Sequence, residues 1–291
     1  TWLFSTMVRS DAEFGTAPWS NAAMSGWILD PDRKKMSKSK GNVVTPMGLL
    51  ETYGSDGVRY WAASGRPGTD TAFDEKEMKV GRRLAIKLLN ASKFALSFGG
   101  DPDGEVHEPI DSAMLADLAA LVDDATAAFE GFDYARALER TEAFFWWFCD
   151  DYVELVKGRA YGIHGEQGAA SAQAALREAL HTILRLFAPF MPFVTDEVWS
   201  WWQAGSVHSQ SWPAAEATPT DVDAALLDPV CEVLAAVRRA KTEAKASQKA
   251  AVALLVVQAP VALQASIQAG EADLRDAGSI TELRYEQADA L

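Results

Sequence analysis

Residues 33–42 read Arg33-Lys34-Lys35-Met36-Ser37-Lys38-Ser39-Lys40-Gly41-Asn42, and this run decides how the rest of the chain is interpreted. The run holds five basic and no acidic residues, and it follows the turn-forming sequence Asp30-Pro31-Asp32. Since Gly41 also permits a tight reversal, we expect a loop. Two ammonium groups three positions apart, with hydroxyl groups beside them, suit a mobile flap that binds a polyphosphate. A solvated basic loop is the alternative that this pattern alone leaves open.

The segments on either side of this loop have recognisable ends. A short apolar strand is expected at 27–29. Thr45-Pro46 has the composition of a helix start, Gly54 should end that helix, and a second short helix is expected at about 56–64. After the Gly- and Pro-rich residues 65–68 a helical periodicity takes over, which places a boundary near residue 70.

Helical patterns fill most of the remaining chain, and repeated helices with short connections predict an antiparallel bundle. One of them contains Phe144-Phe145-Trp146-Trp147-Phe148, which is apolar around the whole helix and should lie at the bundle centre. We expect the helices at about 74–98, 112–130, 133–157, 170–188 and 192–203, closed in turn by Gly99, Gly131, Gly158, Pro189 and Gly205.

The last part of the chain has a different periodicity. A loop rich in Ser, Pro and Ala at 205–222 separates it from the helices before. Here helical and strand-like patterns alternate, which predicts a small α/β module. The expected elements are a helix at 224–246, a strand at 251–258, a helix at 261–277 and a strand at 281–286.

The composition limits the class of protein. The chain has 291 residues, of which 48% are hydrophobic and 23% charged, which excludes a disordered chain and suggests roughly two globular units. No apolar run approaches the ~18–20 residues that cross a bilayer. Cys149 and Cys231 lie far apart without a C-x-x-C partner, so we expect neither a disulfide framework nor a zinc site, and a cytoplasmic location.

Although the net charge is −14, the chain contains three basic stretches. Residues 33–40 carry a net +5, residues 76–93 a net +5 and residues 238–249 a net +4. An acidic chain that concentrates positive charge in this way is suited to bind a polyanion at those places. Each stretch taken alone also fits a solvated helix face.

The loop and its surroundings resemble a known family. Lys35-Met36-Ser37-Lys38-Ser39 is identical to the KMSKS motif of class I aminoacyl-tRNA synthetases, and Gly26-Trp27-Ile28-Leu29 before it and Gly41-Asn42-Val43-Val44 after it are those of the Val/Ile/Leu branch. Residues 53–61, 65–70 and 73–75 resemble the valyl-tRNA synthetase family in particular. The resemblance is strongest over residues 1–98 and continues, more loosely, to about residue 250.

This resemblance implies a mainly α fold. Residues 1–70 would be the end of a Rossmann-type catalytic domain, residues 71–222 an antiparallel helical bundle that binds the anticodon, and residues 223–291 the small α/β module. The implied function is part of a valine–tRNA ligase, which activates valine with ATP and transfers it to tRNA(Val). Two alternatives stay open: a non-catalytic tRNA-binding module derived from a synthetase, and the equivalent portion of a leucyl- or isoleucyl-tRNA synthetase.

The resemblance also assigns site residues. Lys35 and Lys38 would be catalytic, with Lys38 contacting the β and γ phosphates of ATP; Mg²⁺ would come with the nucleotide, and we expect no metal bound by the protein itself. The whole run Lys35, Met36, Ser37, Lys38 and Ser39 would bind ATP. The expected tRNA contacts are Lys79, Arg82, Arg83 and Lys87 in one helix and Arg238, Arg239, Lys241 and Lys245 in another.

The chain departs from the family in one respect. Class I enzymes carry a second motif, His-x-Gly-His, and none of His107, His164, His181 and His208 lies in such a sequence. We therefore expect a C-terminal portion of a synthetase, which alone would not charge tRNA, and we expect the enzyme to be monomeric.

Overall fold

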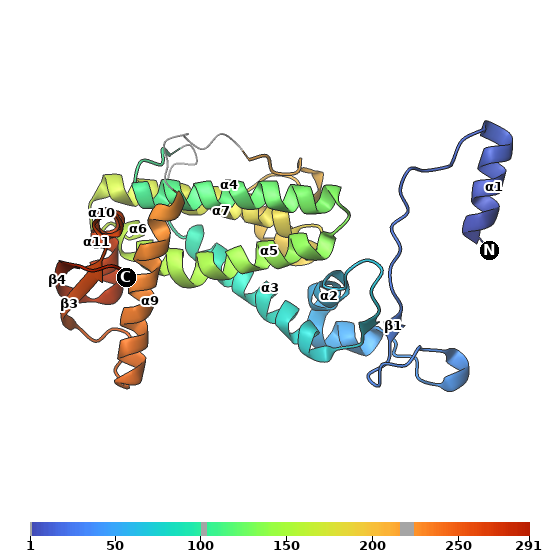
Figure 1. Cartoon of the computed structure of the whole chain (residues 1–291), viewed down its shortest axis with the longest axis horizontal. Helices are drawn as coiled ribbons and strands as arrows, with labels where there is room; N and C mark the ends of the chain where they lie inside the picture. The colour runs from blue at the N-terminus through green and yellow to red at the C-terminus, as the bar shows by residue number, and fades with distance from the viewer. Residues whose placement is uncertain (1, 100–103, 216–223) are drawn as a thin grey trace. The chain divides into compact units, whose positions relative to one another are not determined.

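A computed structural model describes residues 2–99, 104–215 and 224–291 of the chain (Figure 1). The fold is mainly helical, as expected from the sequence. It divides into two compact units: the first consists of the residues up to Val44 together with Gly65–Asp74, and the second of Thr45–Ser64 together with Glu75–Leu291. The expected boundary at 222/223 lies outside the described residues, and the one at residue 70 remains a prediction.

The first unit contains helix α1 (Trp2–Phe14), which has no buried residue. Strand β1 (Ile28–Leu29), expected at 27–29, pairs in parallel with β2 (Thr71–Ala72), which the sequence did not indicate. A hydrogen bond of 2.7 Å from the Trp27 backbone N–H to Asp70 Oδ1 extends this pairing. At Gly26 a Cβ atom would lie 2.0 Å from the carbonyl oxygen of Thr69, so only glycine permits the two segments to approach this closely.

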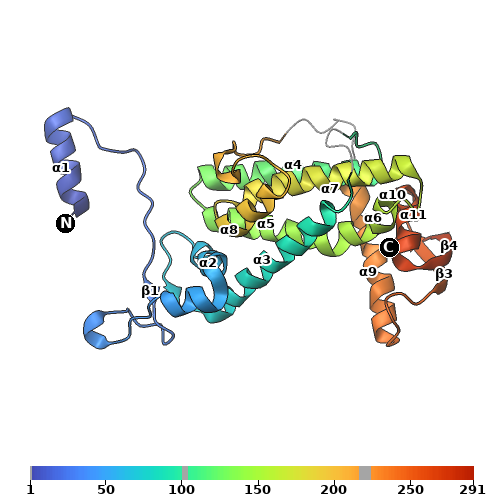
Figure 2. The ribbon, with the colours of Figure 1, turned by 180° about the vertical axis from the view of Figure 1, so that it is seen from behind.

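The second unit is built on long helices, and Figures 1 and 2 show α4, α5 and α7 running side by side. Helix α2 is interrupted at Gly54, where φ is 76° and ψ is 162°, as the sequence suggested. These helices are α2 (Met47–Ala63), α3 (Glu75–Ala95), α4 (Pro109–Glu130), α5 (Tyr134–Trp147), α6 (Val153–Ala160), α7 (Glu166–Phe187) and α8 (Pro192–Ser200).

Two expectations for the central helices are wrong. The helix expected at 133–157 forms and contains a π-helical turn, Phe148–Tyr152, but it continues to Ala160, so Gly158 lies inside it instead of ending it. The aromatic run is also not buried on all sides. Phe145 and Phe148 are buried, whereas Trp146 and Trp147 are only half-buried and pack against the outside of the core.

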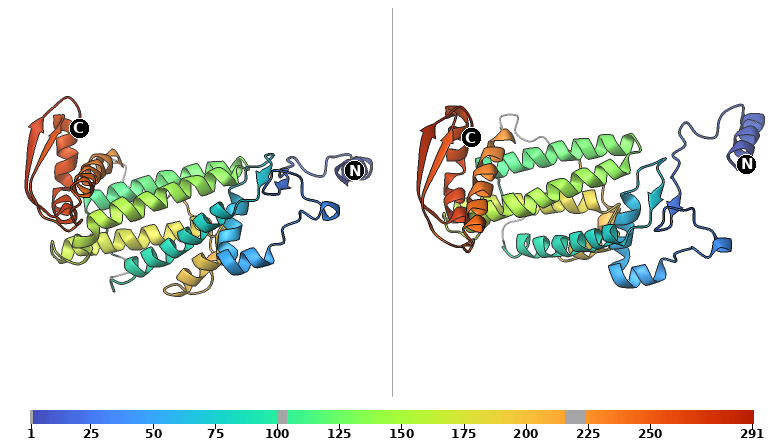
Figure 3. Two further views of the ribbon diagram at one scale, coloured as in Figure 1. Left: turned by 90° about the horizontal axis from the view of Figure 1, so that it is seen from below. Right: turned by 60° about the horizontal axis from the view of Figure 1, so that its bottom comes forward.

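The α/β module follows after two short 3₁₀ turns (Val207–Ser209 and Ala224–Leu226). Strands β3 (Val252–Ala259) and β4 (Ile280–Gln287) pair in parallel with Val252 opposite Ile280, and Figure 3 shows the helices of the module beside them. The single helix expected at 261–277 is broken at Gly270, where a Cβ atom would lie 2.9 Å from Ile110 Cδ1. The helices are α9 (Leu227–Glu243), α10 (Val261–Ala269) and α11 (Glu271–Gly278).

A buried cluster of charges joins the module to the bundle. The guanidinium of Arg159 in α6 donates to both carboxylate oxygens of Asp111 in α4, at 2.6 and 2.8 Å, and to those of Asp273 in α11, at 2.9 and 3.0 Å. Tyr152 and Ser171 donate further hydrogen bonds to Asp111, both of 2.7 Å. Because buried charges are costly without partners, this arrangement fixes α11 against α4 and α6.

Within the described residues, no helix combines the length and the apolar character needed to span a bilayer.

Candidate functional site

The basic loop predicted from the sequence is built on the carboxylate of Asp30, which is 5% exposed. Its Oδ1 accepts a hydrogen bond of 2.7 Å from the backbone N–H of Lys34, and its backbone N–H donates to the carbonyl of Lys34 at 2.8 Å. Arg33, at the tip of this turn, has a φ of 61°. The hydrogen bond from Asn42, followed by the one from Lys34, lowers the pKa of the Asp30 carboxyl, so it is ionised at neutral pH.

The side chain of Asn42 closes the loop from its other end. Its Nδ2 donates to Asp30 Oδ2 at 2.7 Å and to the carbonyl of Lys35 at 3.3 Å, while its Oδ1 accepts from the backbone N–H of Ser37 at 2.9 Å. One amide thus connects the beginning, middle and end of the loop. The sequence indicated Asn42 only as a residue that permits a turn.

The middle of the loop forms a short 3₁₀ turn, Lys38–Lys40, which Ser37 caps by accepting from the backbone N–H of Lys40 at 3.2 Å. The hydroxyl groups of Ser37 and Ser39 are hydrogen-bonded at 2.8 Å. Gly41 ends the turn with a φ of 67°. This geometry leaves the side chain of Lys38 exposed, and no group within the described residues forms a hydrogen bond or ion pair with its amine.

Lys35 is held differently from Lys38. Its Nζ lies 3.6 Å from the centroid of the Trp27 ring, a cation–π contact across the β1 end of the loop. Among the residues of the motif, the structure therefore presents Lys38 and Ser39 to solvent, half-buries Met36 and Ser37, and keeps the Lys35 amine against an indole. The contributions of Trp27 and Asp30 were missed because neither residue belongs to the basic run itself.

The basic residues of α3 do not form one free surface. Lys79 and Arg83 are exposed, while Arg82 donates to the carbonyl of Thr52. Lys87 forms an ion pair of 2.8 Å with Asp150 and also lies 5.7 Å from the Trp146 ring centroid. Partial burial lowers the pKa of the Lys87 amine, but its hydrogen bond to Asp150 and nearby negative charges outweigh this effect and raise it.

The basic residues of α9 divide in the same way. Arg239, and Lys245 just after the helix, are exposed, whereas Arg238 donates to the carbonyl of Asp150 at 2.6 Å. Lys241 is 6% exposed, and its Nζ donates to the carbonyls of Gln248 and Gly278, both at 2.8 Å. Its buried amine thus binds one carbonyl before β3 and one at the C-terminal end of α11, and this geometry leaves no exposed charge for a phosphate.

Comparison with known families gives the class of the protein as a tRNA ligase of class I. Residues 1–74 match the family "tRNA synthetases class I (I, L, M and V)", and residues 111–257 match "Anticodon-binding domain of tRNA ligase". The second match spans half of the chain. The chain therefore belongs to the tRNA ligases that carry this anticodon-binding domain.

Within this class, the chain is similar to valine–tRNA ligases. It is 60% identical to the one from Thermobifida fusca over 99% of this chain and 33% of that protein, and 55% identical to the one from Salinispora tropica over 99% of this chain and 36% of that protein. The valine–tRNA ligase of Leifsonia xyli is 54% identical over 98% of this chain. The chain spans about a third of the length of these curated relatives.

A solved structure with a similar fold is that of a LeuRS from Agrobacterium radiobacter in a ternary complex with tRNA and LeuAMS. The TM-score is 0.59 and the sequence identity 20%, and the match covers 73% of this chain and 26% of that one. At this identity the likeness concerns the fold alone, and it confirms the mainly helical fold.

Proposed function

We propose that this chain is the part of a valine–tRNA ligase that supplies the KMSKS loop and binds tRNA(Val). The observation that carries the proposal is the loop: the exposed amine of Lys38 projects from a scaffold that Asp30 and Asn42 hold together. The similarity to valine–tRNA ligases supports valine over leucine or isoleucine. The two buried free thiols, Cys149 and Cys231, support a reducing, cytoplasmic location.

The reaction has two steps in this proposal. The carboxylate of valine attacks the α-phosphorus of ATP, which forms valyl-adenylate and releases pyrophosphate. A terminal ribose hydroxyl of tRNA(Val) then attacks the carbonyl carbon of valyl-adenylate, and AMP leaves. Lys38 would act in the first step, because negative charge builds up on the β and γ phosphates as pyrophosphate departs, and catalysis comes from contacts that strengthen in the transition state.

Lysine fits this task because it is a compact charge on a flexible stem that can follow the moving phosphates. Lys35 would assist after its amine leaves the ring of Trp27. An exposed cation–π contact is worth ~0.5–1 kcal/mol, whereas a hydrogen bond to a charged group contributes ~1.5–3 kcal/mol. The exchange of the Trp27 ring for a phosphate is therefore favourable for Lys35. We propose that the Lys35 amine contacts the Trp27 ring until a nucleotide binds to the loop.

We propose that tRNA contacts those of the predicted basic residues that are exposed. These are Lys79 and Arg83 in α3, Arg239 in α9 and Lys245 just after α9. Lysine and arginine side chains of this kind neutralise backbone phosphates and position RNA without reading its sequence. Arg82, Lys87 and Arg238 would contribute after exchanging their present partners. Lys241 is left out because its amine is buried.

The decisive experiment measures valine-dependent ATP–pyrophosphate exchange in the complete enzyme that contains this chain. We expect Lys38→Ala to slow exchange by roughly 10² to 10³, the usual effect of losing one donor to a transition-state charge. Lys34→Ala is the matched control, since Lys34 lies in the same loop and pairs only weakly with Asp32 at 3.5 Å.

An unchanged rate in Lys38→Ala, or an equal loss in the control, would remove Lys38 from the mechanism. Exchange driven by leucine or isoleucine instead of valine would overturn the proposed substrate.

A further inference from the structure

The exposed amine of Lys38 is carried by a turn, residues 37–41, that has few connections to the rest of the protein. The hydrogen bonds of this turn join it mostly to itself, through the Ser37 cap and the closing contact at Gly41. Within the described part of the chain, one hydrogen bond leaves the turn, and it runs from the backbone N–H of Ser37 to Asn42 Oδ1. The position of the turn therefore depends on one amide.

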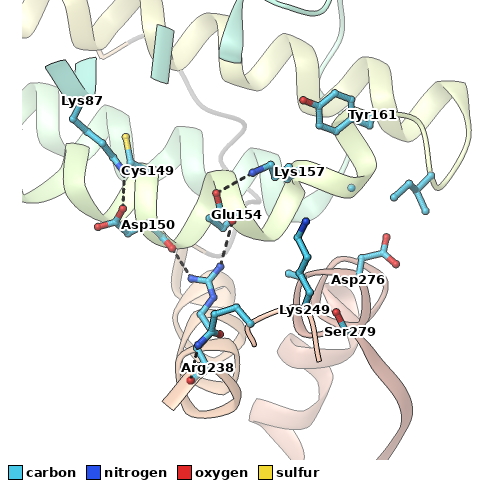
Figure 4. A pocket seen from close by; sticks show the side chains of 14 residues that line it. Lys87, Cys149, Asp150, Glu154, Lys157, Tyr161, Arg238, Lys249, Asp276 and Ser279 are labelled. Atoms are coloured by element: carbon cyan, nitrogen blue, oxygen red, sulfur yellow. Dashed lines mark hydrogen bonds and ion pairs between the residues drawn. The ribbon is translucent and has the colours of Figure 1, made fainter. Parts of the chain in front are cut away.

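Basic side chains elsewhere in the protein are held by acidic partners. Figure 4 shows this for Lys87, whose amine lies 2.8 Å from Asp150 Oδ1, and for Lys157, whose amine lies 3.3 Å from Glu154 Oε1. The amine of Lys38 has no such partner among the residues that the structure describes. Its direction is therefore set by the main chain that carries it, and by the contact that fixes this main chain.

The chain on the N-terminal side of the turn is held independently. Leu29 forms an antiparallel bridge with Lys35, and two hydrogen bonds join Asp30 to Lys34. These contacts fix the loop as far as residue 35. Asn42 extends this scaffold to the turn, because the same amide contacts the Asp30 carboxylate, the Lys35 carbonyl and the backbone of the turn.

The amide of Asn42 has one orientation that satisfies its neighbours. Its Nδ2 lies 2.7 Å from Asp30 Oδ2 and 3.3 Å from the carbonyl oxygen of Lys35, and both acceptors require an N–H group. Oδ1 must then face the backbone N–H of Ser37, at 2.9 Å. Because Asp30 is 5% exposed, a rotated amide would place its oxygen against a buried carboxylate. The carboxylate thus determines where the acceptor for the turn lies.

We propose that Asn42 is a positioning residue for the formation of valyl-adenylate, and that through the Ser37 backbone it directs the Lys38 amine at the β and γ phosphates of ATP. The inference rests on the proposed function, which supplies the nucleotide and the role of Lys38. A donor stabilises a transition state best when it already points to the place where charge develops. A turn released from Asn42 would still carry the amine, but the amine would point in many directions.

The position of Lys38 should affect the rate of the reaction more than the binding of ATP. Its contact with the phosphates strengthens as pyrophosphate departs, so a misdirected amine destabilises the transition state more than the ground state. In the complete enzyme we expect Asn42→Ala to lower kcat of valine-dependent ATP–pyrophosphate exchange by roughly 10- to 10²-fold, while KM for ATP changes by less than about threefold. A change confined to KM would overturn the inference.

A double-mutant cycle with Lys38→Ala tests whether Asn42 acts through Lys38. Once the amine is gone, the loss of Asn42 should have little further effect, so the double variant should match Lys38→Ala within about twofold. Asn42→Asp should be as slow as Asn42→Ala, because a second carboxylate would repel that of Asp30. Asn21→Ala, at an exposed asparagine of the same unit, is the matched control and should react like the wild type.

The second step of the reaction separates positioning from a general loss of structure. Since Lys38 acts in the first step, Asn42→Ala should transfer valine from an isolated enzyme–adenylate complex to tRNA(Val) at the wild-type rate in a single turnover. Loss of both steps, or a double variant much slower than Lys38→Ala, would show a structural role and overturn the inference. Unchanged exchange in Asn42→Ala beside slow exchange in Lys38→Ala would also overturn it, whereas unchanged exchange in Lys38→Ala would overturn the proposed function of the loop itself.

Discussion

At the scale of single residues, the carboxylate of Asp30 organises the KMSKS loop. Because its pKa is lowered in the folded state, its stabilising hydrogen bonds are fully present above the pKa of the unfolded chain and are lost only as the pH falls through the lowered folded value. At neutral pH the carboxylate therefore holds Asn42 and the backbone of Lys34 at full strength.

We expect Asp30→Asn to loosen this loop. An amide has a single acceptor oxygen, whereas the carboxylate has two. In one orientation the new amide would place its NH₂ group against Nδ2 of Asn42, and in the other it would lose the hydrogen bond from the backbone of Lys34. Trypsin should cleave the variant within residues 33–40 about fivefold faster than the wild type. The loss of one hydrogen bond shifts the equilibrium between the closed and the locally open loop by about this factor. Limited digestion followed by mass spectrometry measures the cleavage rate. Asp32→Asn, at an exposed carboxylate, is the control. Equal cleavage rates in the two variants would contradict the role of Asp30.

Sequence reasoning located the motif residues of the loop but not the residues that hold them. Lys35 to Ser39 are consecutive, so their pattern is visible in the chain itself. Asp30 looked like part of a turn, and its burial depends on Asn42, twelve residues away. Lys241 shows the opposite error: its neighbours Arg238 and Arg239 suggest a basic face, but its amine is buried by carbonyls of Gln248 and Gly278, which no local pattern reveals.

At the scale of elements, α2 and α3 pack closely where Gly81 faces Tyr60. A Cβ atom at Gly81 would lie 2.5–2.9 Å from side-chain atoms of Tyr60, which is itself 6% exposed and donates a hydrogen bond of 2.6 Å to Glu142. Tyr60 therefore has no room to move. The absence of a side chain at Gly81 sets the distance between the two helices.

We expect Gly81→Ala to lower the free energy of unfolding by about 1–3 kcal/mol, because overpacking a buried contact outweighs the gain of up to ~1 kcal/mol in helix propensity. Gly48→Ala, in α2, is the matched control. A Cβ there meets nothing within 4 Å, so this variant should be neutral or more stable. Urea unfolding followed by circular dichroism measures both, and a stabilised Gly81→Ala would show that the two helices separate easily.

The sequence predicted elements well where the pattern is local. The break at Gly54 and the two strands of the α/β module fall close to their expected places. Strand β2 was missed because two residues carry no periodicity and pair with a segment 43 positions away. The π-helical turn was missed because the sequence of Phe148–Tyr152 is compatible with a continuous α-helix. The break at Gly270 was missed because this glycine packs against Ile110, which is distant in the sequence.

At the scale of the whole molecule, the Arg159 cluster makes stability depend on pH. Burial raises the pKa of Asp273 to about 6, and the charge of Asp111 adds to this shift, although the charge and the hydrogen bonds of Arg159 oppose it. Since this folded-state pKa lies above the unfolded value, the folded chain binds the proton more tightly. The group therefore stabilises the fold most at low pH, and its contribution declines as the pH rises through 6.

For Asp273→Asn we expect a flatter dependence of the free energy of unfolding on pH. Between pH 4 and 7 the Asp273 carboxyl should lower the free energy of unfolding of the wild type by about 2 kcal/mol. This decrease should be absent in the variant. Unfolding by urea at several pH values measures the difference. The raised pKa of Asp117, also about 6, affects both proteins equally and cancels in the comparison. Parallel curves for the two proteins would show that Asp273 does not titrate in this range.

The position of Arg159 also limits how the chain can be shortened. A truncation at residue 257, where the matched anticodon-binding region ends, would delete α11 and with it Asp273, the partner of Arg159 Nε. The smallest fragment that keeps these charges balanced must extend beyond α11. A fragment that contains the matched anticodon-binding region should therefore extend past β4.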